Sequence, residues 1–244
     1  AVNLLSSNKY SEKQIGYLFL SVLVEQKSDL MKLAIHAIRN DLRSQNPEHV
    51  NLALQCVANV CSLELNEELA LELPEVLLKR VTEDSVKKSA ALCMLNVFRS
   101  MPQSDIWKER ASEIGDLLKD NDLGVLTSVI SLIDALCKMY PEEYKDCVIH
   151  IISRLALLVA SKDLQDYTYC SVPAPWLCVK MLKLLQNFPP PEDASNKIRL
   201  TETLERIIDK AADPLPEKKK VSRSFPHLIT VIGHKGEQKG LVLP

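Results

Sequence analysis

The chain has 244 residues and a net charge of −2, and 46% of its residues are hydrophobic. This composition is typical of a folded protein, and the charge gives no bulk attraction to nucleic acid or to acidic membranes. Only 5% of the residues are aromatic, and three of the six glycines lie in the last twelve residues. The rest of the chain is nearly free of glycine, which is typical of an array of helices.

The spacing of apolar residues predicts one helix after another. The first follows the capping box Ser11–Gln14, and its apolar face consists of Ile15, Leu18, Phe19, Val22 and Leu23. Caps, prolines and helical spacing predict the later helices at about 28–42, 47–61, 66–73, 75–80, 84–100, 104–120, 122–140, 141–161, 174–187 and 195–212.

One helical segment recurs along the chain. Its copies are Glu48–Val60, Ser85–Val97 and Leu123–Ala135. Small residues fall in register at Ala53, Ala90 and Ser128. An amide or an acid falls in register at Asn59, Asn96 and Asp134. Periods of roughly 20–50 residues indicate stacked supersecondary units, and such arrays present long surfaces to partners.

Pairing the helices gives units that start near residues 11, 47, 84 and 122. This size predicts an all-α fold, a right-handed α-solenoid of HEAT/armadillo-like helix pairs over residues 1–213. Within it we expect Asn59, Asn96 and Asp134 to form a structural ladder that bonds the backbone of adjacent units. Residues 214–244 form a basic, Gly-containing tail that we expect to be disordered.

The sequence contains no catalytic or metal-binding motif. It lacks a nucleophile elbow, a phosphate-binding glycine loop and zinc-ligand spacing, and its five histidines are scattered. The seven cysteines include no CxxC pair, so they are interpreted as reduced core thiols. No apolar run reaches the roughly 18 residues of a membrane span. We therefore expect no enzyme, no cofactor and no metal, and no binding of nucleic acid.

Three surface features are candidates for contacts. Lys218, Lys219 and Lys220 could touch anionic lipid, or could belong to a flexible charged tail. Lys79, Arg80, Lys87 and Lys88 could do the same, or could form a solvated helix end. Tyr167, Tyr169, Pro173, Pro175 and Trp176 gather in one connection, where they could dock a partner or pack across a repeat junction; packing is favoured.

Specific stretches of the chain resemble the alpha-adaptin family, the alpha subunits of the clathrin adaptor protein complex 2. These stretches are Ala1–Asn8, Glu12–Phe19, Asp163–Tyr169, Val172–Trp176 and Pro189–Asp193. The resemblance covers about residues 1–221. The family's basic lipid-binding stretch has no counterpart in this sequence, residues 222–244 do not resemble its continuation, and the chain is expected to begin inside a larger protein.

The resemblance implies a non-catalytic trunk of an endocytic adaptor that supports cargo selection in vesicle-mediated transport. The implied partners are a small sigma subunit, a beta large subunit and a mu medium subunit, with clathrin contacted indirectly. Contact with phosphoinositide membrane is implied through parts mostly absent from this sequence. The implied location is cytoplasmic, on the cytosolic face of the plasma membrane at clathrin-coated pits. A coatomer-like or importin-like scaffold and an all-helical enzyme are the alternatives.

Overall fold

The computed structural model describes residues 2–23, 29–79, 83–161, 164, 167–169 and 172–212. The chain divides into two compact units, Ala1–Leu136 and Cys137–Pro244. Among the described residues, no helix combines the length and the apolarity that a membrane span requires. The tail 214–244 and the predicted cap Ser28 lie outside the described residues.

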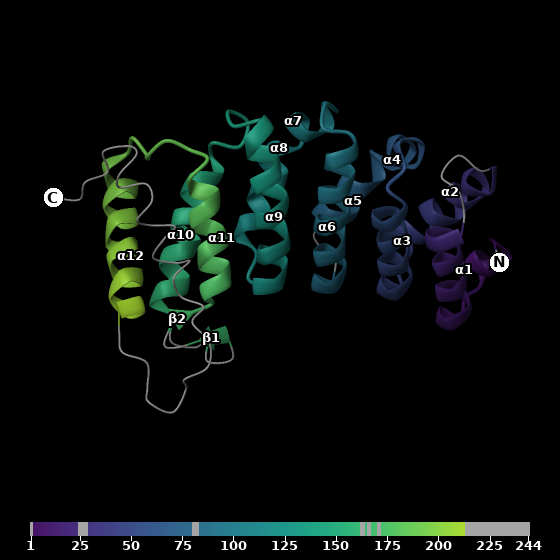
Figure 1. Ribbon diagram of the computed structural model, residues 1–244, viewed down its shortest axis with the longest axis horizontal. Coiled ribbons are helices and arrows are strands. Elements are labelled where there is room, and N and C mark those ends of the chain that lie inside the picture. Colours follow the sequence, from purple (N-terminus) through teal and green to yellow (C-terminus); the bar gives the residue numbers. More distant parts are fainter. Residues whose placement is uncertain are drawn as a thin grey trace. The chain divides into compact units, whose positions relative to one another are not determined.

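The first unit is built from short and long helices in succession. They are the 3-10 helix η1 (Val2–Ser6), α1 (Tyr10–Leu23), α2 (Asp29–Leu42), α3 (Pro47–Val60), α4 (Leu63–Leu69), α5 (Glu72–Leu78), α6 (Asp84–Ser100), α7 (Ile106–Glu109), α8 (Ala111–Asp116), the 3-10 helix η2 (Leu117–Lys119) and α9 (Leu123–Met139), whose last residues belong to the second unit. Figure 1 shows α1, α3, α6 and α9 side by side with roughly aligned axes. Their starts agree with the predicted repeat starts near 11, 47, 84 and 122.

The boundaries of α3 follow from its capping residues. Asn46 accepts a hydrogen bond from the Glu48 N–H at 3.0 Å, and Pro47 occupies the first helical position. Proline is tolerated there because its missing N–H would have no partner within the helix. The helix ends at Val60, and the next residue, Cys61, has a φ of 43°, which is the left-handed conformation that stops helices.

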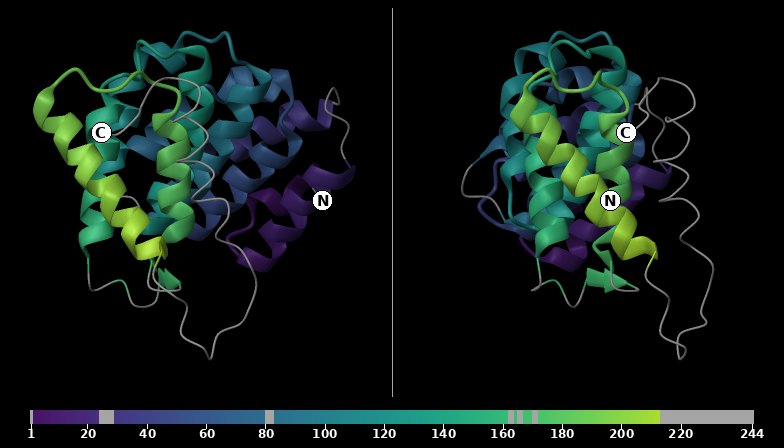
Figure 2. Two further views of the ribbon diagram at one scale, coloured as in Figure 1. Left: turned by 60° about the vertical axis from the view of Figure 1, so that its left-hand side comes forward. Right: turned by 90° about the vertical axis from the view of Figure 1, so that its left-hand side faces the viewer.

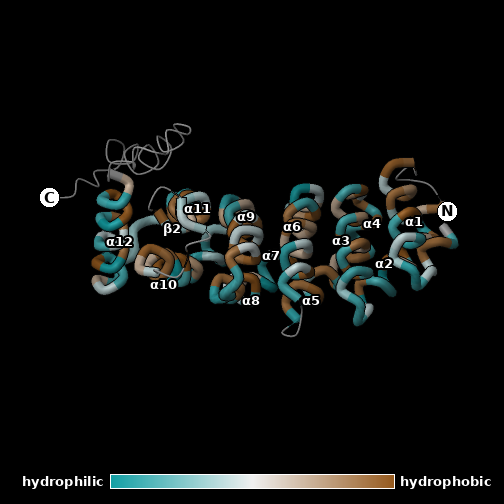
Figure 3. The backbone as a smooth tube through the Cα atoms, turned by 90° about the horizontal axis from the view of Figure 1, so that it is seen from below, coloured by the Kyte–Doolittle hydropathy of each residue, from teal (hydrophilic) through white to brown (hydrophobic). Residues whose placement is uncertain are grey.

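Small side chains allow neighbouring helices to pack closely in the first unit. Helix α3 contacts α1, α2 and α6. Ala53 on α3 and Ala90 on α6 are fully buried, and Ser128 on α9 is 8% exposed. Figure 3 shows hydrophobic and hydrophilic residues alternating along the helices, as expected when one side of each helix is buried.

The apolar face predicted for α1 is not the face that the structure buries. The structure buries Lys13, Gly16, Tyr17 and Leu20, which share one face at helical spacing. The predicted face is largely exposed at Ile15, Leu18, Val22 and Leu23. Burial of this face is possible despite its lysine, because the Lys13 ammonium lies beside the carboxylate of Asp41.

This buried ion pair joins three elements of the first unit. Lys13 Nζ lies 2.8 Å from both carboxylate oxygens of Asp41 on α2, and it also donates to the Leu5 carbonyl of η1. Tyr17 donates its hydroxyl hydrogen to the same carboxylate. Lys13 and Asp41 are 4% and 7% exposed. Paired and hydrogen-bonded charges are the form in which ionised groups can be buried.

Two helix boundaries near prolines differ from the prediction. Pro74 does not stop a helix but lies in the first turn of α5, where no partner for its missing N–H is needed. The helix expected from Pro141 begins only at Cys147 (α10, Cys147–Ala160). Residues 141–146 form tight turns instead, anchored by the completely buried Tyr144.

The helix predicted over 104–120 is interrupted at Arg110. This residue has φ −97° and ψ 9°, and it separates α7 from α8. Its guanidinium lies 2.7 Å from a carboxylate oxygen of Glu75 on α5 and 2.8 Å from one of Glu113 on α8. The side chain at the break therefore ties two consecutive repeats together.

The second unit combines helices with one short strand pair. Its elements are α10, β1 (Thr168–Tyr169), β2 (Val172–Pro173), α11 (Pro175–Leu185) and α12 (Ala194–Ala212). The strands are antiparallel, with Thr168 opposite Pro173 and Tyr169 opposite Val172. Helix α10 contacts both α11 and α12. Figure 2 shows α12, in yellow-green, inclined to the two green helices beside it.

Candidate docking surfaces

The predicted polar ladder is uneven in the structure. Asn96 on α6 reaches the Ala58 carbonyl on α3 through a long hydrogen bond of 3.5 Å from its Nδ2. Asn59 is exposed and Asp134 is half-buried. The residue that sequence reasoning missed is Asn66, which is completely buried and donates to the Ser100 hydroxyl at 2.6 Å. Asn66 lies outside the repeated segment, so no periodic signal marks it.

Ion pairs join the repeat of α6 to the next one. Lys87 Nζ lies 2.8 Å from Asp120, and Lys88 Nζ lies 3.1 Å from Asp122. These two lysines were half of the basic cluster considered for lipid contact. Because their charges are met by acids of the next repeat, the structure favours the interpretation as a helix end over a lipid-facing patch. Arg80 lies outside the described residues.

The protonation of the closer pair is fixed near neutral pH. The hydrogen bond to Asp120 raises the pKa of Lys87. Burial pushes the pKa of Asp120 upward, but the hydrogen bonds from Lys87 and from the Asp122 N–H outweigh it, so this pKa lies below its usual value. Both groups are thus ionised at every pH between the lowered pKa of Asp120 and the raised pKa of Lys87, so the ion pair is present throughout that range.

The aromatic connection separates into exposed and buried members. Tyr167 and Trp176 are 57% and 64% exposed, and the Trp176 ring lies 5.4 Å from that of Tyr169, centroid to centroid. Pro173 and Pro175 are buried. The structure thus brings all five residues into one connection, with the prolines packed inward and two aromatic rings presented to solvent.

The described residues show neither a metal-binding cluster nor, at Cys56 and Cys178, a reactive thiol. Among them, no group of three or more His, Cys, Asp or Glu side chains could hold a metal ion. Burial raises the pKa of Cys56 to about 11 and that of Cys178 to about 12. Because the thiolate is the reactive form, these thiols are inert near neutral pH. Cys170 and the predicted lipid-contacting residues Lys218, Lys219 and Lys220 lie outside the described residues.

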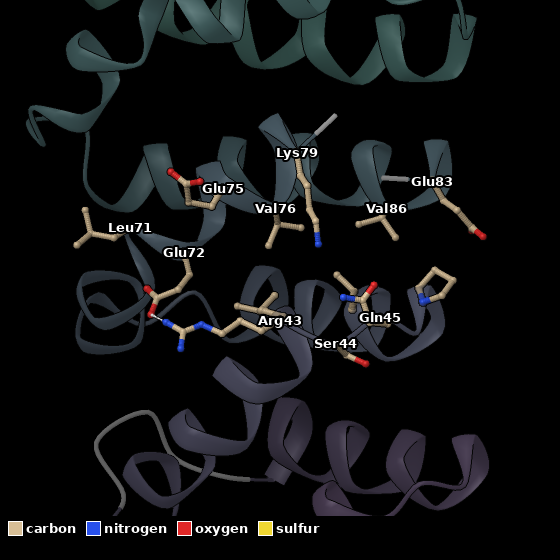
Figure 4. A pocket seen from close by; sticks show the side chains of 13 residues that line it. Arg43, Ser44, Gln45, Leu71, Glu72, Glu75, Val76, Lys79, Glu83 and Val86 are labelled. Atoms are coloured by element: carbon tan, nitrogen blue, oxygen red, sulfur yellow. Dashed lines mark hydrogen bonds and ion pairs between the residues drawn. The ribbon is translucent and has the colours of Figure 1, made fainter. Parts of the chain in front are cut away.

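A groove of about 530 Å³ opens in the first unit between the α2–α3 turn, α5 and the start of α6. Leu42, Val50 and Val86 form an apolar floor, and they are 4%, 5% and 3% exposed. Figure 4 shows charged side chains along the rim, with the Lys79 amino group pointing into the space between α5 and the α2–α3 turn. No sequence pattern predicts this groove, because its lining comes from three separate segments.

Comparison with known proteins identifies the family. The family model described as adaptin N terminal region matches residues 1–223. The chain belongs to the adaptin family. This adaptin is 40% identical over 212 residues to the AP-2 complex subunit alpha-1 of Arabidopsis thaliana, which covers 85% of the chain and 21% of that protein. The predicted resemblance to alpha-adaptin over about residues 1–221 is thereby confirmed.

Other relatives extend the same pattern. The adaptin is 34% identical over 212 residues to the AP-2 complex subunit alpha-2 of Dictyostelium discoideum, over 85% of the chain and 21% of that protein. It is 30% identical over 204 residues to the AP-1 complex subunit gamma of the same organism, over 81% of the chain and 22% of that protein. The chain therefore spans about a fifth of the length of these relatives.

A structural comparison supports the fold class. The adaptin matches a homology model of the full-length AP-3 complex in an intermediate open conformation with a TM-score of 0.61 and 21% identity. The match covers 86% of this chain and 35% of that chain. Together with the helical units described above, it confirms the predicted all-α solenoid of helix pairs. Family membership also sets aside the importin-like alternative.

Proposed function

We propose that this adaptin is a non-catalytic scaffold segment of a clathrin-associated endocytic adaptor complex. The observation that carries the proposal is the 40% identity over 212 residues to proteins named as alpha subunits of AP-2, against 30% to an AP-1 gamma subunit. Stacked helix pairs support a scaffold role, since each unit contacts mainly its neighbours and leaves a long surface for partners.

The proposed partners are the sigma, beta and mu subunits of such a complex, with clathrin reached indirectly. The complex would act on the cytosolic face of the plasma membrane at coated pits and take part in cargo selection. Within the second unit, Tyr167 and Trp176 support a docking role because large aromatic side chains exposed at a surface are enriched at protein interfaces. Lys218, Lys219 and Lys220 remain a proposed contact to anionic lipid.

Affinity purification of the tagged chain from cytosol, followed by mass spectrometry, tests the proposal. We expect sigma, beta and mu subunits of the AP-2 type to co-purify. Recovery of AP-1-type subunits would instead assign the chain to a different adaptor complex. Recovery of the chain alone, or with chaperones only, would contradict the scaffold proposal.

A matched pair of variants tests the aromatic surface in the same experiment. Trp176→Ala removes the exposed ring, whereas Leu157→Ala removes a similarly exposed apolar side chain, 59% accessible, from α10 of the same unit. If the aromatic connection docks a subunit, Trp176→Ala alone reduces its recovery. Equal recovery with both variants would favour the interpretation of this connection as internal packing.

A further inference from the structure

Helix α12 carries apolar residues on two sides, and the first of these sides packs on α10. Ile207 is buried there, and the main contacts of the helix are with α10 and β2. Lys210 Nζ donates to the Val159 carbonyl of α10 at 2.6 Å. Arg199 donates to the Ser153 hydroxyl of the same helix at 3.2 Å. These bonds hold one side of α12 against α10, which Figure 1 shows beside it.

The second side, the outer face of α12, is formed by Ile198, Thr201, Glu205 and Ile208, which recur at helical spacing. Ile198 and Ile208 are 60% and 39% exposed. At a rise of 1.5 Å per residue, these two isoleucines lie about 15 Å apart along the helix axis. The half-buried Leu204 lies one turn before Ile208 and extends the apolar surface toward the covered side.

An apolar run, Leu228–Ile232, follows α12 in the sequence. It lies outside the described residues, and also outside residues 1–223, which match the adaptin family model. As an extended segment, the run spans about 13 Å from its first Cα atom to its last, close to the separation of the two isoleucines. Residues 213–227 connect it to α12 and can span roughly 50 Å, so the run can reach the whole outer face.

The charges around the run complement those of the outer face. Glu202, Glu205 and Asp209 are exposed, and they lie four, seven and eleven residues after Ile198, which places them on its side of the helix. Basic residues flank the run, with Arg223 before it and Lys235 after it. A segment laid along the outer face therefore brings opposite charges together at its borders.

The size of the outer face favours this run over a second copy of the chain. A stable interface between two proteins buries roughly 800 Å² on each partner, more than two partly exposed isoleucines supply. A segment tethered to the same chain needs less contact area, because its effective concentration is on the order of millimolar. The apolar run of the same chain is thus the occupant that fits.

We propose that Leu228–Ile232 folds back onto the outer face of α12 and covers Ile198 and Ile208. Apolar side chains of the run and of the helix then leave water together, which stabilises the contact. In stacked helical arrays, an outer helix needs such a cover for solubility. The proposal goes beyond the adaptor role and is independent of it, since it concerns a contact within one chain and is tested without other subunits.

Limited proteolysis of the whole 244-residue chain by chymotrypsin tests the contact. Leu215 and Phe225 each precede a proline, which blocks cleavage, so the first large apolar cleavage site after α12 is Leu228 within the run. We expect slow cleavage there, since the rate follows the undocked fraction. Ile208→Asp places a charge in the contact and should speed this cleavage roughly tenfold or more. Ile149→Asp is the matched control, because Ile149 is 47% exposed on α10 of the same unit, and it should leave the rate unchanged.

Nuclear Overhauser effects between methyl groups locate the contact in the labelled chain. We expect them between the run and Ile198 or Ile208, and Val231→Asp, a change outside every helix, should remove them. A mixture of labelled and unlabelled chains separates a contact within one chain from a contact between two copies. The proposal is wrong if wild type and Ile208→Asp are cleaved equally fast, or if Ile149→Asp speeds cleavage as much. It is also wrong if the effects are absent or arise only between copies.

Discussion

Removal of the Asp41 carboxylate is expected to destabilise the first unit strongly. Lys13 Nζ lies 2.8 Å from both carboxylate oxygens, and the two residues are 4% and 7% exposed. Asp41→Ala leaves a buried ammonium without its counter-charge, so we expect a loss of about 3–5 kcal/mol in the free energy of unfolding. For a chain of this length, such a loss lowers Tm by roughly 6–20 °C.

Thermal unfolding followed by far-UV circular dichroism measures this loss, with Lys9→Met as control. Lys9 forms an ion pair with Glu12 at 3.1 Å, but its side chain is 78% exposed, so little change in Tm is expected. The double variant Lys13→Met with Asp41→Leu removes both charges and should be more stable than Asp41→Ala alone. The ion pair does not hold η1, α1 and α2 together if Asp41→Ala unfolds at the same temperature as the Lys9 control. The same conclusion follows if the double variant is no more stable than Asp41→Ala.

Three further predictions concern the same unit. Gly16→Ala should destabilise the fold by roughly 1 kcal/mol despite the better helix propensity of alanine, because overpacking outweighs that gain; the new Cβ would lie 3.0 Å from Leu5 Cδ2 and 3.2 Å from Leu5 N. A midpoint in urea at or above that of the wild type would contradict this. Burial, and to a lesser degree the hydrogen bond to Asp41, raises the pKa of Tyr17. The free energy that the protonated Tyr17 hydroxyl contributes to folding is therefore fully present below pH 10 and is lost as the pH rises further. Absorbance at 295 nm should therefore show Tyr17 ionising only with alkaline unfolding, as the buried Tyr144 also should, and Tyr17→Phe should reduce the amplitude of that late step by one tyrosine; an unchanged amplitude would argue against it. Lys87→Met should cost about 1 kcal/mol at pH 7 and less in acid, because the lowered pKa of Asp120 makes its stabilisation disappear as the pH falls through that value. A cost of Lys87→Met, measured by urea unfolding, that does not fall as the pH is lowered through the titration of Asp120 would contradict the ion pair between repeats.

The order of helices could be read from the chain because it depends on local chemistry. Asn46 and Pro47 mark the start of α3 by capping and by fixed backbone geometry, and both act within one turn. The recurrence of Ala53 and Ala90 likewise indicates close packing wherever the helices meet. The start of α10 was missed because Tyr144 holds residues 141–146 in turns through burial, which no local signal at Pro141 reveals.

The candidate surfaces were less predictable than the helices. The clustering of Tyr167 and Trp176 was visible in the sequence, but their exposure, and the burial of Pro173 and Pro175 beside them, was not. The groove below Lys79 depends on three segments meeting, and the neutralisation of its acids depends on Arg39 and Arg110 from other helices. A helical period states which residues share a face but not which face is covered.

The sequence by itself determined the all-α class, the repeat of helix pairs and the family, because periodicity, caps and identity are properties of the chain. The tertiary structure alone decided that α1 buries the side with Lys13 instead of its more apolar side. It also decided that Lys87 and Lys88 meet acids of the next repeat. The physical reason is the same in both cases: a charge can be buried or neutralised only by a partner close in space, and these partners lie roughly one repeat away in the chain.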